Sequence, residues 1–181
     1  YTTTCGESSY RKEFDVIGKD IKPRLDLVTV DATTGKNYLS WGKISENIQS
    51  IFSKIQIYKE IGLVDNFVKI AEVDITETGF TDPTSDPNSH QSFYRIAYAT
   101  ANGAAGIMSD VYSTVHLMLN QGYNANSVNL IWTAPDGIKV SGYIISRGYS
   151  PNEMTELTRL SGRVTAYTDY LQSDTTKAYY A

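Results

Sequence analysis

The feature that most constrains the fold is a series of short strand-like runs separated by turn signals. In KIQIYKE (54–60), Ile55 and Ile57 face one side while Gln56 and Tyr58 face the other, which is the period of a β-strand. No part of the chain has the pattern of a long amphipathic helix. The other runs are LDLVTV (25–30), NYLSW (37–41), FVKIAEV (67–73), SFYRIAYATA (92–101) and VYSTVHLML (111–119). Many short strands with regular turns predict an all-β sandwich or barrel.

The two halves of the chain carry the same motifs in the same order. Placing Trp132 under Trp41 aligns them with small insertions and deletions. The aligned pairs are YLSW (38–41) with NLIW (129–132), IQIYKE (55–60) with YIISRG (143–148), FVKIAEV (67–73) with MTELTRL (154–160), TGFTD (78–82) with TAYTD (165–169), and FYR (93–95) with YYA (179–181). This internal similarity predicts one structural unit used twice.

The N-terminal stretch fits the same repeat. YTTTCG (1–6) matches YATANG (98–103), and EFDVI (13–17) matches TVHLM (114–118). Residues 1–17 therefore read as the last strands of a preceding sandwich.

The predicted organisation has four parts. We expect the end of a preceding sandwich at 1–17, a linker at 18–23, a complete sandwich at 24–118, and a second sandwich at 119–181 that lacks its last strands in this chain. The sequence leaves two interpretations of the ends open. The chain is a window cut from a longer array, or residues 1–17 fill the gap in the second sandwich of a neighbouring chain.

Several motifs carry a family resemblance. Trp41 in YLSW is followed by IQIYKE, and FYRIAYATANGAAG (93–106) is close to the pattern Tyr-x-x-x-Val-x-Ala-x-Asn-x-x-Gly. Ser109 then precedes a further strand, and Trp132 is followed by APDG (134–137). In these features the chain resembles the fibronectin type III domain over essentially its whole length. The resemblance implies immunoglobulin-like β-sandwiches in tandem, as in arrays of bacterial surface and secreted proteins. No Arg-Gly-Asp motif is present, so animal-type cell attachment is not implied.

Four aromatic residues are the expected core anchors, because large rings bury the most apolar area. They are Trp41, Trp132, Tyr94 and Tyr98. The alternative for the two tryptophans is an exposed platform on which a sugar stacks.

Composition excludes some partners. With 16 Lys and Arg against 20 Asp and Glu, the net charge is −4, which argues against nucleic acid. No apolar run reaches the ~20 residues of a membrane span. Cys5 is the single cysteine, so no intrachain disulfide is expected. A small buried hydrophobe is the favoured role for Cys5, over a reactive thiol or a bond to another chain.

The sequence offers no catalytic constellation. His90 and His116 lack the spacing of zinc ligands, and we expect both to be solvated. There is no Gly-x-Ser-x-Gly elbow and no phosphate loop between a strand and a helix. We therefore expect no enzyme activity, no cofactor and no metal.

One acidic cluster deserves a test as a calcium site. It comprises Asp74, Glu77, Asp82 and Asp86, but the D-x-D-x-D-G pattern is absent. Asp82 and Asp169 read instead as residues that accept turn hydrogen bonds at strand ends.

Two loops are candidate interaction sites. KISENIQS (43–50), with the adjoining Ile51 and Phe52, predicts either a short edge strand packed on the core or an exposed contact patch. In that segment Ile48, Ile51 and Phe52 are the residues of interest. In the second loop they are Asn102 and Gly103, where glycine suits a positive φ.

The leading interpretation is a non-enzymatic structural or interaction module, a rod-like array that spaces or attaches something at a bacterial surface or in a secreted assembly. We expect a protein partner or neighbouring repeats, in a secreted or surface location whose targeting segment lies outside this chain. One alternative is an accessory spacer or carbohydrate-binding module of a larger secreted enzyme. Another is a component of a phage fibre.

Overall fold

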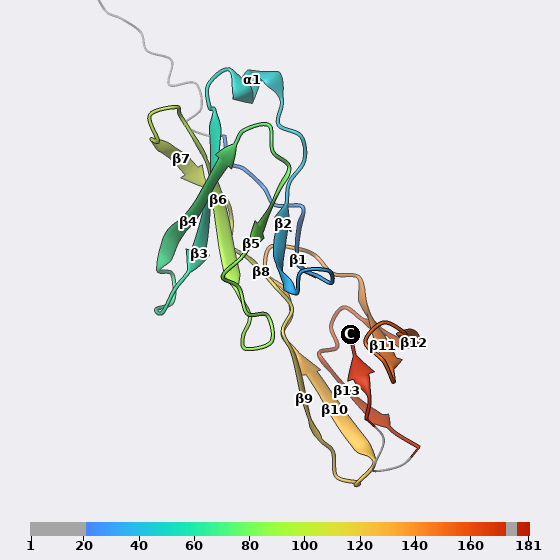
Figure 1. Cartoon of the computed structure of the whole chain (residues 1–181). Coiled ribbons are helices and arrows are strands. Elements are labelled where there is room, and N and C mark those ends of the chain that lie inside the picture. Colours follow the sequence, from blue (N-terminus) through green and yellow to red (C-terminus); the bar gives the residue numbers. More distant parts are fainter. Residues whose placement is uncertain (1–20, 173–176) are drawn as a thin grey trace, which may run out of the picture.

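The computed structural model describes residues 21–172 and 177–181, and in that part the chain forms fourteen strands and one short helix (Figure 1). The predictions for residues 1–17, including that for Cys5, lie outside the described residues, as does the first part of the predicted linker at 18–23. Within the described residues, no helix has the length and apolar character needed to cross a membrane.

The first sandwich consists of two antiparallel sheets that face each other. One has the order β1-β2-β5, and the other has the order β4-β3-β6-β7, with β8 paired to β6. This arrangement is that of the fibronectin type III fold, and it confirms the predicted fold class. The strand bounds are β1 (Leu27–Asp31), β2 (Lys36–Ser40), β3 (Lys54–Glu60), β4 (Phe67–Asp74), β5 (Gly79–Asp82), β6 (Phe93–Ala99), β7 (Ala105–Met108) and β8 (Tyr112–Ser113).

The core of the first sandwich follows from strand alternation. On β3, Ile55 and Ile57 point between the sheets and are fully buried. Trp41, Tyr94 and Tyr98 are buried in the same cluster. Its apolar rows come from both sheets, so burial of these side chains holds the sheets together.

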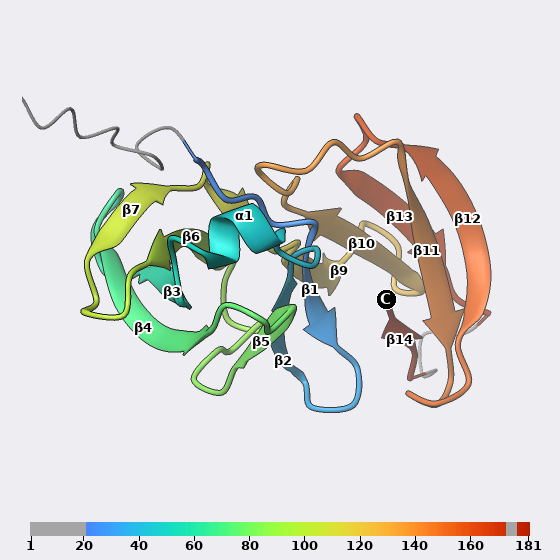
Figure 2. The same cartoon turned by 90° about the horizontal axis from the view of Figure 1, so that it is seen from above.

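The second sandwich repeats this strand order for six strands, and among the described residues it has no counterpart of β7 or β8. One sheet runs β13-β10-β9 and the other β12-β11-β14. Its core is smaller, with Leu130, Trp132 and Ile145 buried. The bounds are β9 (Leu117–Gln121), β10 (Ser127–Trp132), β11 (Gly142–Gly148), β12 (Thr155–Ser161), β13 (Ala166–Tyr170) and β14 (Tyr179–Tyr180). The two sandwiches lie side by side in the view from above (Figure 2).

The strand expected over 111–119 is wrong as a single element. Within this run only the part that forms β8 joins the first sandwich, by pairing with β6, whereas β9 pairs with β10 of the second sandwich. The expected boundary at 118/119 therefore falls inside β9. The physical reason is that Leu117 packs against the core of the second sandwich. The chain therefore leaves the sheet of the first sandwich before residue 117.

The segment 43–50 contains a helix rather than the expected edge strand. Helix α1 spans Glu46–Gln49, one turn at the end of the first sandwich. Ile48 lies on α1, and Ile44 and Ile51 lie just before and just after the helix. All three pack against the first core. The apolar residues of this loop thus complete the core instead of forming an exposed patch.

Candidate functional site at the joint

The short linker between the sandwiches is hydrogen-bonded on both sides. The Thr114 amide donates to the Ser92 carbonyl over 3.0 Å, within the first sandwich. Two residues later, the His116 amide donates to Thr133 Oγ1 over 2.9 Å, and the Thr133 amide donates to the His116 carbonyl over 3.1 Å. The chain is therefore fixed on each side of the crossing, which is unlike a flexible linker.

A loop of the second sandwich also docks on the first. The Asp136 amide donates to Ser113 Oγ over 2.7 Å, and the Ser113 amide donates to the Asp136 carbonyl over 3.3 Å. Gln91 adds a bridge, because its Nε2 donates to Ser113 Oγ and to the Ala134 carbonyl. The loop that the sequence marks as APDG thus pairs with β8, although β8 belongs to the other sandwich.

Close packing accompanies these hydrogen bonds. Gly137 has a φ of 75°, and a Cβ built on it would lie 2.5 Å from the Val111 carbonyl oxygen and 2.6 Å from the Tyr112 ring. The next residue, Ile138, packs against the core cluster of the first sandwich. Glycine is needed here both for its backbone conformation and for the close approach.

His116 is buried at this joint, so the expectation that it is solvated was wrong. Its Nδ1 lies 2.9 Å from the Pro87 carbonyl oxygen, and the residue is 9% exposed. His90, in contrast, is exposed on the same loop as Pro87. The neighbours of His116 in sequence, Val115 and Leu117, are apolar, and in the structure the residue lies between Pro87 of the first sandwich and Thr133 of the second.

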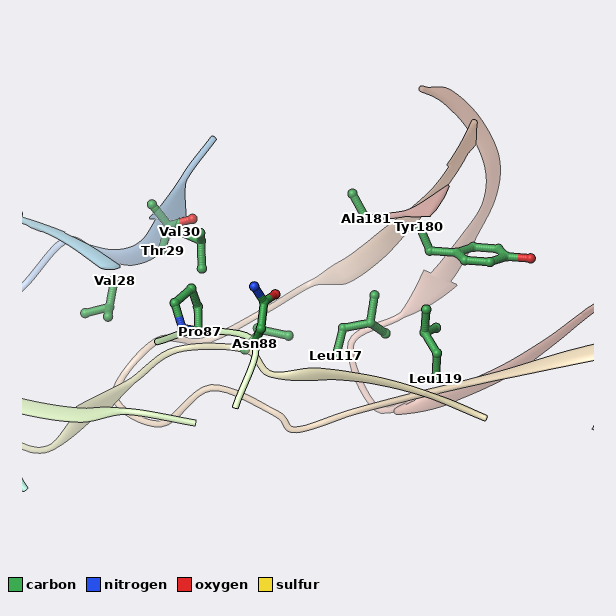
Figure 3. A pocket seen from close by; sticks show the side chains of 10 residues that line it. Val28, Thr29, Val30, Pro87, Asn88, Leu117, Leu119, Tyr180 and Ala181 are labelled. Carbon is green, nitrogen blue, oxygen red and sulfur yellow. The ribbon is translucent and has the colours of Figure 1, made fainter. Parts of the chain in front are cut away.

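A groove of about 460 Å³ runs beside the joint (Figure 3). Figure 3 shows side chains of β1 and of residues 87–88 on one side and of β9 and β14 on the other. Its apolar lining includes Val28, Val30, Leu117 and Leu119. Any ligand in this groove would contact both sandwiches and would depend on their relative placement.

A buried ion pair crosses the interior of the first sandwich. Lys59 Nζ lies 2.8 Å from Asp82 Oδ2, and their side chains are 11% and 1% exposed. The Tyr94 hydroxyl donates to the same oxygen over 2.8 Å, and Asn37 Nδ2 donates to that hydroxyl over 2.8 Å. The other oxygen, Oδ1, accepts from the amide and the hydroxyl of Thr84. The carboxylate is thus surrounded by donors.

The second sandwich has an ion pair at the matching positions. Arg147 Nη1 lies 2.8 Å from Asp169 Oδ2 and 3.1 Å from Oδ1. The Tyr180 hydroxyl donates to Asp169 Oδ2 over 2.9 Å. This pair is more open, with side chains 24% and 6% exposed.

These contacts set the protonation of the groups. Burial alone would raise the pKa of Asp82, but hydrogen bonds from Lys59, Thr84 and Tyr94 outweigh it and lower the pKa. Burial raises the pKa of Tyr94, and the Asp82 carboxylate that its hydroxyl faces raises it further. The pKa of Tyr180 is also raised, by burial and by the Asp169 carboxylate. Both hydroxyls therefore remain donors at neutral pH.

Of the residues expected to form interaction loops, some are buried in the structure and others are exposed. Phe52 is buried, with its ring centroid 5.6 Å from that of Tyr98, while Ile48 on α1 and Ile51 after it are partly buried against the first core. Asn102 and Gly103 are exposed at the β6–β7 turn, where Gly103 has the expected positive φ. An interaction role for that turn stays a prediction.

The acidic residues do not gather into a metal site. Among the described residues, no group of three or more His, Cys, Asp or Glu side chains is placed to hold a metal ion. Asp82 accepts the expected turn hydrogen bonds from Thr84. Its second role, as partner of Lys59, was missed at the sequence level. The missed signal is that Lys59 shares the strand face of Ile55 and Ile57.

Comparisons with known proteins concern the fold. No protein-family model matches the chain, and no curated protein matches its sequence. Pectate lyase Pel3 from Pectobacterium carotovorum is 21% identical over 48% of this chain and 25% of that chain, with a TM-score of 0.35. The chain thus spans about a quarter of that lyase.

Two further similar structures have fibronectin-type names. A Fn3-like protein from Clostridium thermocellum is 16% identical, with 51% of this chain and 91% of that chain covered and a TM-score of 0.39. A two-domain fibronectin type III segment of chicken tenascin is 14% identical, with 82% of each chain covered and a TM-score of 0.33. At such identities and TM-scores the likeness carries no activity to this chain.

Proposed function

We propose that the chain is a non-enzymatic structural module, part of a rod-like array of sandwiches that spaces or presents a partner at a bacterial surface or in a secreted assembly. The observation that carries this proposal is the joint. The second sandwich pairs its Asp136 with Ser113 and inserts Ile138 against the first core. A spacer needs such a joint, because two sandwiches on a loose linker would not hold a fixed distance.

The buried polar groups support a structural role. Asp82 and Asp169 lie between the sheets, and each accepts hydrogen bonds from a cation and a tyrosine of its own sandwich. Carboxylates with these partners stabilise a fold, whereas a general base needs access to a substrate proton. Hydrolytic activity in the purified chain would contradict a non-enzymatic role.

The joint can be tested by measuring how the sandwiches tumble. Backbone ¹⁵N relaxation should give one common rotational diffusion tensor for both sandwiches. Gly137→Ala should separate them into two, because the added methyl group collides with the Val111 carbonyl. Gly103→Ala is the matched control: that glycine also has a positive φ, but its built Cβ meets nothing within 4 Å. Independent tumbling of the unmodified chain would overturn the spacer proposal.

A second candidate function, carbohydrate binding, is favoured by the outer face of the sheet β13-β10-β9. There Asn129 Nδ2 donates to Asn120 Oδ1 over 3.0 Å, and the Thr168 hydroxyl donates to Asn129 Oδ1 over 2.9 Å. Tyr170, 59% exposed, lies two residues along the strand and so on the same face. An exposed aromatic ring beside oriented amides suits an uncharged sugar.

This candidate is tested by an NMR titration with cellohexaose. If it is correct, shifts should map to Asn129 and Thr168, and Tyr170→Ala should abolish them. Tyr149→Ala is the control, since Tyr149 is similarly exposed at 54% but follows β11. Absence of shifts at millimolar sugar would remove carbohydrate binding and leave the spacer proposal untouched.

A further inference from the structure

We propose that the buried side chains of Lys59 and Asp82 condense to an intramolecular amide that joins the two sheets of the first sandwich. Lys59 lies on β3 of one sheet and Asp82 ends β5 of the facing sheet, with 2.8 Å between Nζ and Oδ2. Both side chains are almost excluded from water. This is a modification site, and it goes beyond the proposed spacer function.

The two oxygens of the Asp82 carboxylate have different partners. Oδ1 accepts from the Thr84 amide over 2.9 Å and from the Thr84 hydroxyl over 2.7 Å. Two fixed donors on one oxygen resemble an oxyanion hole, which stabilises the charge that develops when the carboxyl carbon is attacked. Oδ2 accepts from Lys59 and from the Tyr94 hydroxyl. It is therefore the oxygen placed to gain protons and leave.

The condensation needs no other reactant. A proton first passes from the Lys59 ammonium to Asp82 Oδ2, giving a neutral amine and a carboxylic acid. The Nζ lone pair then attacks Cγ, and a C–N bond forms while Oδ1 takes up negative charge. A second proton moves from nitrogen to Oδ2, the C–Oδ2 bond breaks, and water leaves. The sum is one ammonium and one carboxylate giving one amide and one water.

Position and burial both favour this step. Well-oriented intramolecular reactions reach effective concentrations of about 10⁵ M or more, far above those of free reactants. A buried pair of charges carries a desolvation cost that a neutral amide avoids. Tyr94 is itself held in place by Asn37, whose Nδ2 donates to the Tyr94 hydroxyl.

The second sandwich supplies an internal control. Arg147 occupies the place of Lys59, at a similar distance from Asp169. A guanidinium group stays protonated in proteins and has no free lone pair for attack. One amide is therefore expected in the first sandwich and none in the second.

The test is the intact mass of the purified chain in a denaturing solvent. After prolonged incubation of the folded protein, the mass should lie one water below that of the sequence. Trypsin should fail to cut after Lys59, and the peptides 55–69 and 70–95 should remain joined through the side-chain amide. Peptides on both sides of Arg147 should separate normally.

Two variants assign the loss of water. Lys59→Met and Asp82→Ala should each show the full mass of its own sequence, and this mass can be read even if the variant unfolds. A full mass for the unmodified chain overturns the proposal. A missing water that persists in Lys59→Met also overturns it, because a succinimide at Asp136–Gly137 would give the same mass.

Discussion

Each sandwich pairs a buried aspartate with a cation at matching positions, but the cation is a lysine in the first and an arginine in the second. In the first, Lys59 pairs with Asp82 in an interior that water scarcely reaches, and Asn37 supports Tyr94 from behind. In the second, Arg147 pairs with Asp169 through both oxygens at a more open position. The residue aligned with Asn37 is Val128, which offers no donor to Tyr180.

This difference shows how a shared position adapts to its surroundings. A lysine presents a compact charge that a deep site can enclose, whereas Arg147 reaches both carboxylate oxygens from one nitrogen, Nη1, at a more open position. The tryptophans follow the same trend. Trp41 Nε1 donates to the Glu77 carbonyl over 2.7 Å, but Trp132 Nε1 is buried without a protein partner in the described residues. At the tryptophan, therefore, the first sandwich satisfies a polar atom that the second leaves without a partner.

The largest expected effect follows from removing each carboxylate. Relative to the chain before the Lys59–Asp82 amide forms, Asp82→Ala should cost about 3–5 kcal/mol of unfolding free energy, because it leaves Lys59 buried without a counter-charge. Asp169→Ala should cost only about 1–3 kcal/mol, since Arg147 can turn toward water. Urea unfolding followed by NMR signals of each sandwich measures both. Exposed Asp86→Ala, expected within about 0.5 kcal/mol, is the control. Equal losses at Asp82 and Asp169 would refute the comparison.

The next effect crosses the joint. Ile138→Ala should destabilise the first sandwich by about 2 kcal/mol, although the residue belongs to the second, because it removes a side chain packed on the first core. Ile144→Ala is matched in chemistry but is 50% exposed on β11, and should change stability by less than about 0.5 kcal/mol. Hydrogen exchange of β8 amides resolves the two. No change in that exchange would show that the insertion contributes nothing.

The tyrosine hydroxyls give a smaller contrast. Tyr94→Phe should cost about 1.5 kcal/mol, since Asn37 Nδ2 and Asp82 both lose a partner, and Tyr180→Phe about 1 kcal/mol, since only Asp169 does. Thermal unfolding of the two variants measures the difference. A larger loss for Tyr180→Phe would contradict the view that the first network is the more tightly coupled.

High pH should destabilise both sandwiches, through the ionisation of Tyr94 in the first and of Tyr180 in the second. The pKa of Tyr94 and that of Tyr180 are both raised in the folded chain, so each contributes stability that is complete below the unfolded value of about 10. That contribution is lost as pH rises from there through the folded pKa. The free energy of unfolding of both sandwiches should therefore fall above about pH 10. The midpoints of urea unfolding, measured across this pH range, test this. Tyr94→Phe should flatten the dependence in the first sandwich alone.

Much of the fold could be predicted from strand alternation. KIQIYKE was assigned to a strand with the bounds of β3, and the alignment of the halves placed Arg147 under Lys59 and Asp169 under Asp82. The same alternation puts Lys59 on the buried face, which demands a partner. Sequence spacing could not identify this partner, because Asp82 lies on the opposite sheet. The pattern of a single strand does not show which residues of the facing sheet lie opposite it.

The joint was harder to foresee for a similar reason. The loop APDG was recognised, but its contacts with Ser113 depend on how one sandwich lies against the other. His116 was expected to be solvated although its neighbours Val115 and Leu117 are apolar, and the joint buries it. Helix α1 was missed although the spacing of Ile44, Ile48 and Ile51 is helical, because strand signals dominate on both sides.

The insertion of Ile138 also has a consequence for biosynthesis. The chain leaves the ribosome from its N-terminus, and β8, the last strand of the first sandwich, is complete at Ser113. Its core acquires Ile138 only after β9 and β10 have also emerged. Domains generally fold as units during synthesis, N-terminal first. Here the first unit gains its full stability only once the nascent chain has extended well into the next, so maturation of the first sandwich is coupled to translation of the second.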